Sequence, residues 1–107
     1  RLYFYKKGEW MSLEVIQNLI IETLKEYNQE LESKELENPT INTRLYGASS
    51  ALDSLGLVYV IGDLEDKIYK NFHKSIVLAD ERAMSQKTSP FRSVETLANY
   101  IQNLLEE

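Results

Sequence analysis

The sequence predicts an all-α protein: a bundle of three main helices and one short helix, with a long loop after the first helix. Two observations indicate this class. Apolar residues recur at steps of three and four in three separate stretches, which is the period of an amphipathic helix. No alternation of polar and apolar residues runs long enough to build a sheet. The length of 107 residues fits one small domain with a modest core.

The first expected helix covers residues 12 to 33. Ser12 can cap its start, and an apolar stripe that we expect to face the core follows. This stripe consists of Leu13, Ile16, Ile20, Leu24, Tyr27 and Leu31. The periodicity stops from residue 34 to residue 51, where Asn38-Pro39 and Gly47 favour turns. We therefore expect a long ordered loop after this helix.

The second expected helix begins near Asp53, a good N-cap residue, and runs to about Lys70. One of its faces carries the apolar residues Leu57, Ile61, Leu64 and Ile68. We expect this face to be buried and the opposite face to form a different kind of surface.

The sequence pattern in the last third of the chain predicts a short connection and two further helices. In residues 71 to 79 we expect Ile76 and Leu78 to plug the core from a loop. Residues 80 to 86 fit a helix of about two turns. Ser93 can cap a final helix that ends at Leu105 or Glu106. The inward stripe expected for it is Val94, Leu97, Ile101 and Leu104.

Composition excludes several kinds of site. The chain has no cysteine, so it has no disulfide, thiol nucleophile or cysteine-containing zinc site. A single histidine, His73, leaves little from which to build a histidine-based triad or a multi-histidine metal site. The longest apolar run, residues 57 to 61, is far too short to span a membrane. We expect a cytoplasmic protein with no membrane span.

Charge is distributed unevenly along the chain. Residues 1 to 10 carry a net charge of +2, whereas the whole chain carries −5. The acidic remainder should repel nucleic-acid phosphate and favour protein partners instead. Because the first ten residues differ in composition and Met11 follows them, we expect an added or upstream segment there. The domain is then residues 11 to 107.

Conventional enzyme motifs are missing from the sequence, which contains no Walker loop, GxGxxG, HExxH or GxSxG pattern. Glu65 and Asp66 are neighbours on a helix, so their side chains diverge by about 100° and cannot flank one substrate. We interpret both as a solvated acidic face, and Glu35 and Glu37 likewise as solvated. His73 is expected to be exposed or to cap a helix.

Ser54 is a stronger candidate because of its position. It directly follows the capping residue Asp53, so its hydroxyl should be exposed at the positive end of a helix dipole. A phosphodiester attached there would be stabilised by roughly 0.3–1 kcal/mol through that dipole and the unpaired amides of the first turn. The plain alternative is that Ser54 is a second helix-start residue beside Asp53.

The residues around Ser54 favour a specific family. The stretch Leu52-Asp53-Ser54-Leu55, after a glycine-containing loop and before an apolar-faced helix, resembles the acyl carrier protein family and its peptidyl carrier relatives. The resemblance covers residues 12 to 105, because the family has the same order of a long helix, a long loop, a helix opening with Asp-Ser-Leu, a short helix and a final helix. Later positions look alike as well: Ile76, Leu78, Asp80-Glu81, Ser89-Pro90-Phe91, Val94, Leu97, Tyr100 and Ile101.

The resemblance implies that Ser54 carries 4′-phosphopantetheine, transferred from coenzyme A by a separate phosphopantetheinyl transferase. The thiol of that arm would hold an acyl or aminoacyl group as a thioester, and acyl-loading and acyl-transfer enzymes would act on it. The chain would then be a carrier and a substrate of its partners, not an enzyme. Asp53 corresponds to the family's residue before the serine, and Leu55 to an apolar neighbour that contacts partners. We expect a monomer.

Two positions depart from the family pattern. Gly56 and Tyr59 stand where members from fatty acid synthesis commonly place acidic residues. The expected partner surface is therefore partly apolar and low in relief, and it consists of Leu55, Gly56, Tyr59, Gly62, Asp63 and Asp66. This departure favours a specialised pathway of lipid, surface-polysaccharide or secondary-metabolite synthesis.

Other classes of function stay open at this point. A peptidyl or aminoacyl carrier would use the same serine. A noncatalytic helical adaptor would leave Ser54 unmodified and dock a partner helix on the face with Leu55 and Tyr59. A small hydrolase would need Ser54 and His73 together, although no third orienting residue is apparent.

Overall fold

The described part of the chain is helical. The computed structural model describes residues 13–46, 50, 52–78 and 89–106. Its elements are α1 (Leu13–Leu31), the 3₁₀ helix η2 (Lys34–Leu36), α2 (Ser54–Phe72) and α4 (Val94–Glu106). These residues contain no strand, and one isolated antiparallel bridge joins Arg44 to Ser93. The all-α prediction with three long helices is confirmed. The short helix expected at residues 80 to 86 and the segment 1 to 10 lie outside the described residues.

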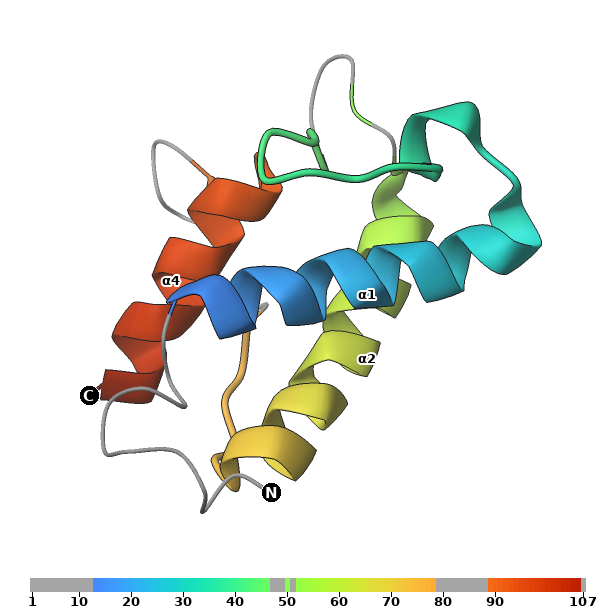
Figure 1. Cartoon of the computed structure of the whole chain (residues 1–107). Coiled ribbons are helices and arrows are strands. Elements are labelled where there is room, and N and C mark those ends of the chain that lie inside the picture. Colours follow the sequence, from blue (N-terminus) through green and yellow to red (C-terminus); the bar gives the residue numbers. More distant parts are fainter. Residues whose placement is uncertain (1–12, 47–49, 51, 79–88, 107) are drawn as a thin grey trace.

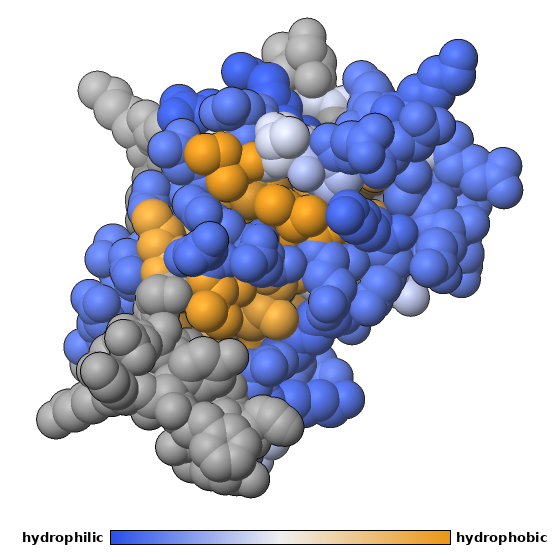
Figure 2. Space-filling view, in the orientation of Figure 1, coloured by the Kyte–Doolittle hydropathy of each residue, from blue (hydrophilic) through white to orange (hydrophobic). Residues whose placement is uncertain are grey.

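The three long helices form a crossed arrangement. α1 packs against both α2 and α4 and lies across them (Figure 1). On the face shown in Figure 2, hydrophobic residues reach the surface in patches that are separated by hydrophilic side chains. No helix in the described part of the chain is long and apolar enough to cross a membrane.

The core consists mainly of the stripes expected from the sequence. From the three helices it takes Ile16, Ile20 and Leu24, then Leu57, Ile61, Leu64 and Ile68, then Val94, Leu97 and Ile101. Four positions are less buried than expected. Leu31, the last residue of α1, is exposed. Three others are half-buried and pack against the core: Leu13, Tyr27 and Leu104. At the end of α4, Leu105 is the fully buried position.

The long loop after α1 is anchored at two places. Leu36 and Leu45 are both fully buried in the core. The backbone N–H of Leu45 donates to the carbonyl of Arg92 at 2.9 Å, and that of Val94 donates to Thr43 at 3.1 Å. These contacts hold the end of the loop beside the start of α4. The expectation of an ordered loop is met over its described residues.

α2 has well-formed ends. Asp53 caps its start as expected, with a carboxylate oxygen accepting from the backbone N–H of Gly56 at 2.7 Å. The helix continues to Phe72, two residues beyond the expected end. His73 then adopts a left-handed conformation with φ 58°, and its N–H donates to the Tyr69 carbonyl. His73 is exposed and caps the helix, as expected.

The segment after α2 closes one end of the core. Leu78 is fully buried and Ile76 is half-buried, so the expected plug is confirmed. The Leu78 N–H donates to a Glu65 carboxylate oxygen at 2.8 Å, and Lys74 Nζ donates to the Leu105 carbonyl at 2.7 Å. Glu65 was expected to be solvated, and that prediction is wrong. Its carboxylate is half-buried because it satisfies the backbone of the plug.

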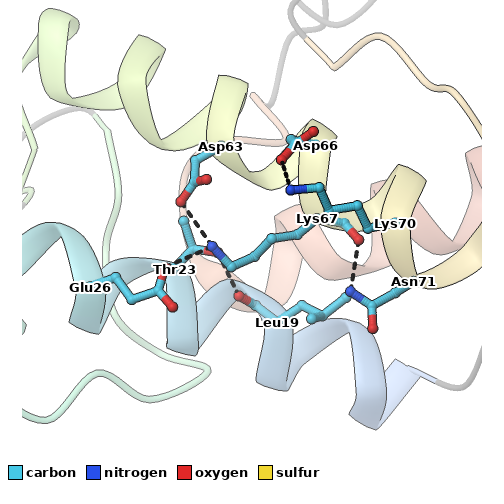
Figure 3. A network of polar contacts seen from close by, with 8 residues as sticks. All are labelled: Leu19, Thr23, Glu26, Asp63, Asp66, Lys67, Lys70 and Asn71. Carbon is cyan, nitrogen blue, oxygen red and sulfur yellow. Dashed lines mark hydrogen bonds and ion pairs between the residues drawn. The ribbon is translucent and has the colours of Figure 1, made fainter. Parts of the chain in front are cut away.

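A charged contact joins α1 to α2. Lys67 Nζ lies 2.7 Å from a carboxylate oxygen of Glu26 and 2.9 Å from one of Asp63, and its side chain is 16% exposed (Figure 3). Burial by itself lowers the pKa of Lys67, but the hydrogen bonds and negative charges of the two carboxylates outweigh it and raise that pKa above its ordinary value.

Candidate functional site

Ser54 is the first residue of α2 and its side chain is exposed. The capping carboxylate of Asp53 sets where the helix begins, and therefore fixes Ser54 at the end where backbone N–H groups point outward. The Ser54 hydroxyl thus lies at the positive end of the helix dipole, as the sequence predicted.

The Ser54 hydroxyl has one neighbour that sequence reasoning missed. Tyr46 Oη lies within hydrogen-bond distance of Ser54 Oγ, at 3.3 Å. Tyr46 directly follows the buried, anchored Leu45, so the loop after α1 delivers its side chain to the start of α2. In the sequence, Tyr46 is visible only as an aromatic residue directly before Gly47, and this position does not indicate a contact with Ser54.

A pocket of about 320 Å³ opens beside Ser54. It is lined by Tyr46, Ser54, Leu57, Val58, Ser89 and Phe91. Of these, Leu57 and Phe91 are buried in the core, whereas Val58 is exposed. The deep part of the pocket is therefore apolar, and hydroxyl groups lie at its edge. Its volume is at the small end of the range of about 300–1,000 Å³ that is typical of small-molecule sites.

A second pocket of about 290 Å³ lies between the end of α1 and the residues before α2. Its lining residues are Tyr27, Leu31, Ser50, Leu52 and Asp53. The Ser50 hydroxyl is turned to the Leu52 carbonyl at 3.1 Å, so it serves the loop backbone.

The residues of the expected partner surface differ in their exposure. Leu55, Tyr59 and Gly62 are exposed on α2, and Val58 joins them. Further along the helix, Asp63 is half-buried and Asp66 is exposed. Tyr59 also packs against Tyr27 of α1, with ring centroids 5.2 Å apart.

Gly56 does not belong to that surface. It is buried, and a Cβ at this position would lie 3.0 Å from Tyr27 Oη and 3.2 Å from Asp53 Oδ1. The expectation that Gly56 lies on an exposed surface is wrong, because Tyr27 of α1 reaches over the first turn of α2. A glycine here allows that close approach.

The hydrolase interpretation is also wrong. Ser54 begins α2 and His73 follows its last residue, so a helix of 19 residues separates them. At a rise of about 1.5 Å per residue the two side chains are held at opposite ends of a rod of roughly 28 Å. In the part of the chain that the structure describes, no group of three or more acidic or histidine side chains could hold a metal ion.

Comparison with known proteins identifies no relative: no family model, curated protein or solved structure matches the chain. A functional assignment therefore depends on the residues around Ser54 and on their geometry.

Proposed function

We propose that this chain is a carrier protein of the acyl carrier type, which holds acyl or aminoacyl groups as thioesters on 4′-phosphopantetheine attached to Ser54. One observation carries the proposal. An exposed serine directly follows its capping aspartate at the start of a 19-residue helix, in the Asp53-Ser54-Leu55 setting. In this view the chain is no enzyme, and it serves as a substrate for its partners.

The residues at the start of α2 fit a phosphodiester. Attachment joins Ser54 Oγ to the phosphorus of the pantetheine phosphate and breaks the pyrophosphate bond of coenzyme A. Adenosine 3′,5′-bisphosphate is the leaving group, and the hydroxyl proton passes to a base of the transferase. The helix dipole and the free N–H groups of the first turn stabilise the new negative charge. The Tyr46 hydroxyl, 3.3 Å from Ser54 Oγ, is a donor available to an oxygen of the attached phosphate. When bound, the arm supplies the thiol that this cysteine-free chain lacks.

The pocket beside Ser54 supports the same function. Its depth is formed by apolar side chains, including Leu57 and Phe91. An apolar acyl group that returns toward the protein on its arm can enter there and be shielded from water. We also propose the four-helix carrier fold for this chain, in which residues 80 to 86 form the short helix.

The proposal also extends to partners and setting. A phosphopantetheinyl transferase loads the arm, and acyl-loading and acyl-transfer enzymes then act on it. The carrier works as a monomer in the cytoplasm, in a specialised lipid, surface-polysaccharide or secondary-metabolite pathway. Its α2 face supports this specialisation because Tyr59, not an acid, stands one turn after Leu55.

A noncatalytic adaptor is the second candidate. The exposed side chains of Leu55, Val58 and Tyr59 could dock a partner with Ser54 unmodified. The two functions differ in one measurable property, the covalent state of Ser54.

The test is the intact mass after incubation with coenzyme A and a broad-specificity phosphopantetheinyl transferase. We expect the wild type to gain one phosphopantetheine group and Ser54→Ala to gain none. Ser50→Ala is the matched control, because its hydroxyl lies close in sequence but is turned to the Leu52 carbonyl. This control should be modified in full. An unchanged wild-type mass with several transferases, or a modified Ser54→Ala chain, contradicts the proposal.

A further inference from the structure

The half of α2 that adjoins Ser54 is uncharged. The nine residues 54 to 62 contain no acidic or basic side chain. Three of their apolar or aromatic side chains are largely exposed: Leu55 at 81%, Val58 at 65% and Tyr59 at 61%. A single exposed apolar side chain is common on protein surfaces. A group of neighbouring ones indicates an interaction surface.

The acids in the second half of the helix are engaged within the chain. Asp63 pairs with Lys67 at 2.9 Å, and Asp66 pairs with Lys70 at 3.0 Å (Figure 3). Glu65 is turned to the Leu78 backbone. Asp66 and Lys70 balance each other, whereas Lys67 also pairs with Glu26 of α1, so the group of Glu26, Asp63 and Lys67 keeps one net negative charge.

The remaining acid near the serine is engaged too. Asp53 accepts a hydrogen bond from the Gly56 N–H as the helix cap. A basic cluster on a partner would have to compete with these contacts for each carboxylate of α2 and its cap.

Gly62 keeps the middle of this surface low. It is exposed, and a Cβ added there would meet no atom within 4 Å. Glycine is disfavoured inside a helix, and no packing within the described chain requires it at this position. It leaves the backbone of α2 open to close approach between Tyr59 and Asp66.

We propose that the uncharged face of α2, defined by Leu55, Val58, Tyr59 and Gly62, docks an apolar surface on the enzymes that act at Ser54, and that a basic patch on those enzymes is not required. The inference rests on the proposed carrier function, because it names the chemistry of that carrier's partners. Charge complementarity is the argument: a face with no charge of its own, bordered by carboxylates that already have partners within the chain, matches an apolar and weakly charged surface. The face begins one residue after Ser54, so a partner seated on it reaches the serine.

The test measures binding without turnover. The probe is a broad-specificity phosphopantetheinyl transferase in the presence of coenzyme A, titrated calorimetrically against the Ser54→Ala chain, which cannot accept the arm. The dissociation constant is compared at low salt and at about 0.25 M salt, where exposed charges are screened beyond roughly 6–8 Å. We expect it to change less than about threefold, because little charge is involved.

Two valines provide a matched pair of variants. Val58 and Val77 are 65% and 60% exposed, and only Val58 lies on the proposed face. We expect Val58→Ser to weaken binding by about fivefold or more and Val77→Ser by less than about twofold. Circular dichroism of both variants checks that the fold is retained.

Several results would overturn the inference. Binding weakened more than about tenfold by salt, with Val58→Ser and Val77→Ser alike, would indicate a basic partner surface. A dimer in sedimentation that Val58→Ser dissociates would make a second copy of this chain the occupant. Failure of the transferase to bind at all would also contradict it.

Arm transfer to the wild type is read separately by mass, so the two failures can be told apart. A modified wild type with salt-dependent binding overturns the apolar face alone. An unmodified wild type that binds through Val58 overturns the carrier function, and with it the claim that the face serves enzymes acting at Ser54.

Discussion

Gly56 and Gly62 stand on the same helix in opposite environments, and this decides what a side chain would do at each. A Cβ at Gly56 would meet Tyr27 Oη at 3.0 Å and the capping carboxylate of Asp53 at 3.2 Å. A Cβ at Gly62 would meet open space. The carrier proteins that the sequence resembles commonly have an acid at the position of Gly56, but here a side chain at position 56 would be crowded against Tyr27 and Asp53.

Substitutions at these two glycines should therefore have opposite effects on stability. Gly62→Ala should stabilise the fold by about 0.5–1 kcal/mol, because alanine loses less backbone freedom in a helix. Gly56→Asp should destabilise it by about 1–3 kcal/mol, because the new carboxylate is crowded against Tyr27 and Asp53. Urea denaturation of both variants measures the difference. Equal effects at the two positions would show that the approach of α1 to the first turn of α2 is misplaced.

Residue by residue, the site divides into a part that the sequence predicts and a part that it does not. The positions of Asp53 and Ser54 at the start of α2 are predictable, because a helix cap is determined by hydrogen bonds within one turn. Tyr46 and the burial of Gly56 depend on a loop and on a neighbouring helix. No periodicity within α2 carries that information.

At the scale of elements, the contact of Lys67 with Glu26 and Asp63 joins α1 to α2 beside the apolar core. Because the folded-state pKa of Lys67 is raised, its charged form stabilises the fold. This contribution is fully present below the unfolded lysine value of about 10.4 and is lost as the pH rises through the folded value.

Lys67→Met should therefore lower the free energy of unfolding by about 1 kcal/mol near neutral pH, and the deficit should shrink above about pH 10.4. Lys70→Met is the control, since Lys70 is 71% exposed and its pair with Asp66 is solvated. It should cost less than about 0.5 kcal/mol. Urea titrations of the three chains at neutral and alkaline pH make the comparison. A Lys67→Met deficit that is constant with pH would contradict the assigned role.

The helices were predictable as elements because their apolar stripes are strong. The observed C-terminal ends of α1 and α2, Leu31 and Phe72, each differ from expectation by two residues, whereas α4 ends at Glu106 as expected. The role of Glu65 was not predictable, because its partner is the backbone of Leu78, and a sequence does not show which carbonyl or amide a side chain will meet. From sequence alone, an acidic residue on a helix is therefore predicted to be solvated, and only the packing around it shows otherwise.

At the scale of the whole molecule, three separate segments meet around Ser54. The loop after α1 brings Tyr46, α2 brings the serine and Val58, and the segment before α4 brings Phe91. The bridge between Arg44 and Ser93 ties two of these segments together next to the pocket. The fold therefore presents one exposed hydroxyl beside an apolar pocket and an uncharged helix face, which is the arrangement that the carrier proposal uses.

The most direct test of the carrier function is the intact mass of the protein recovered from its native cell, with the Ser54→Ala chain expressed beside it. We predict that the wild type carries one phosphopantetheine group, with or without an attached acyl or aminoacyl group that hydroxylamine releases, on the fragment that contains Ser54. Ser54→Ala should have the mass of its amino-acid sequence. A wild-type chain recovered entirely at its unmodified mass, or a modification mapped to another residue, would contradict the carrier function.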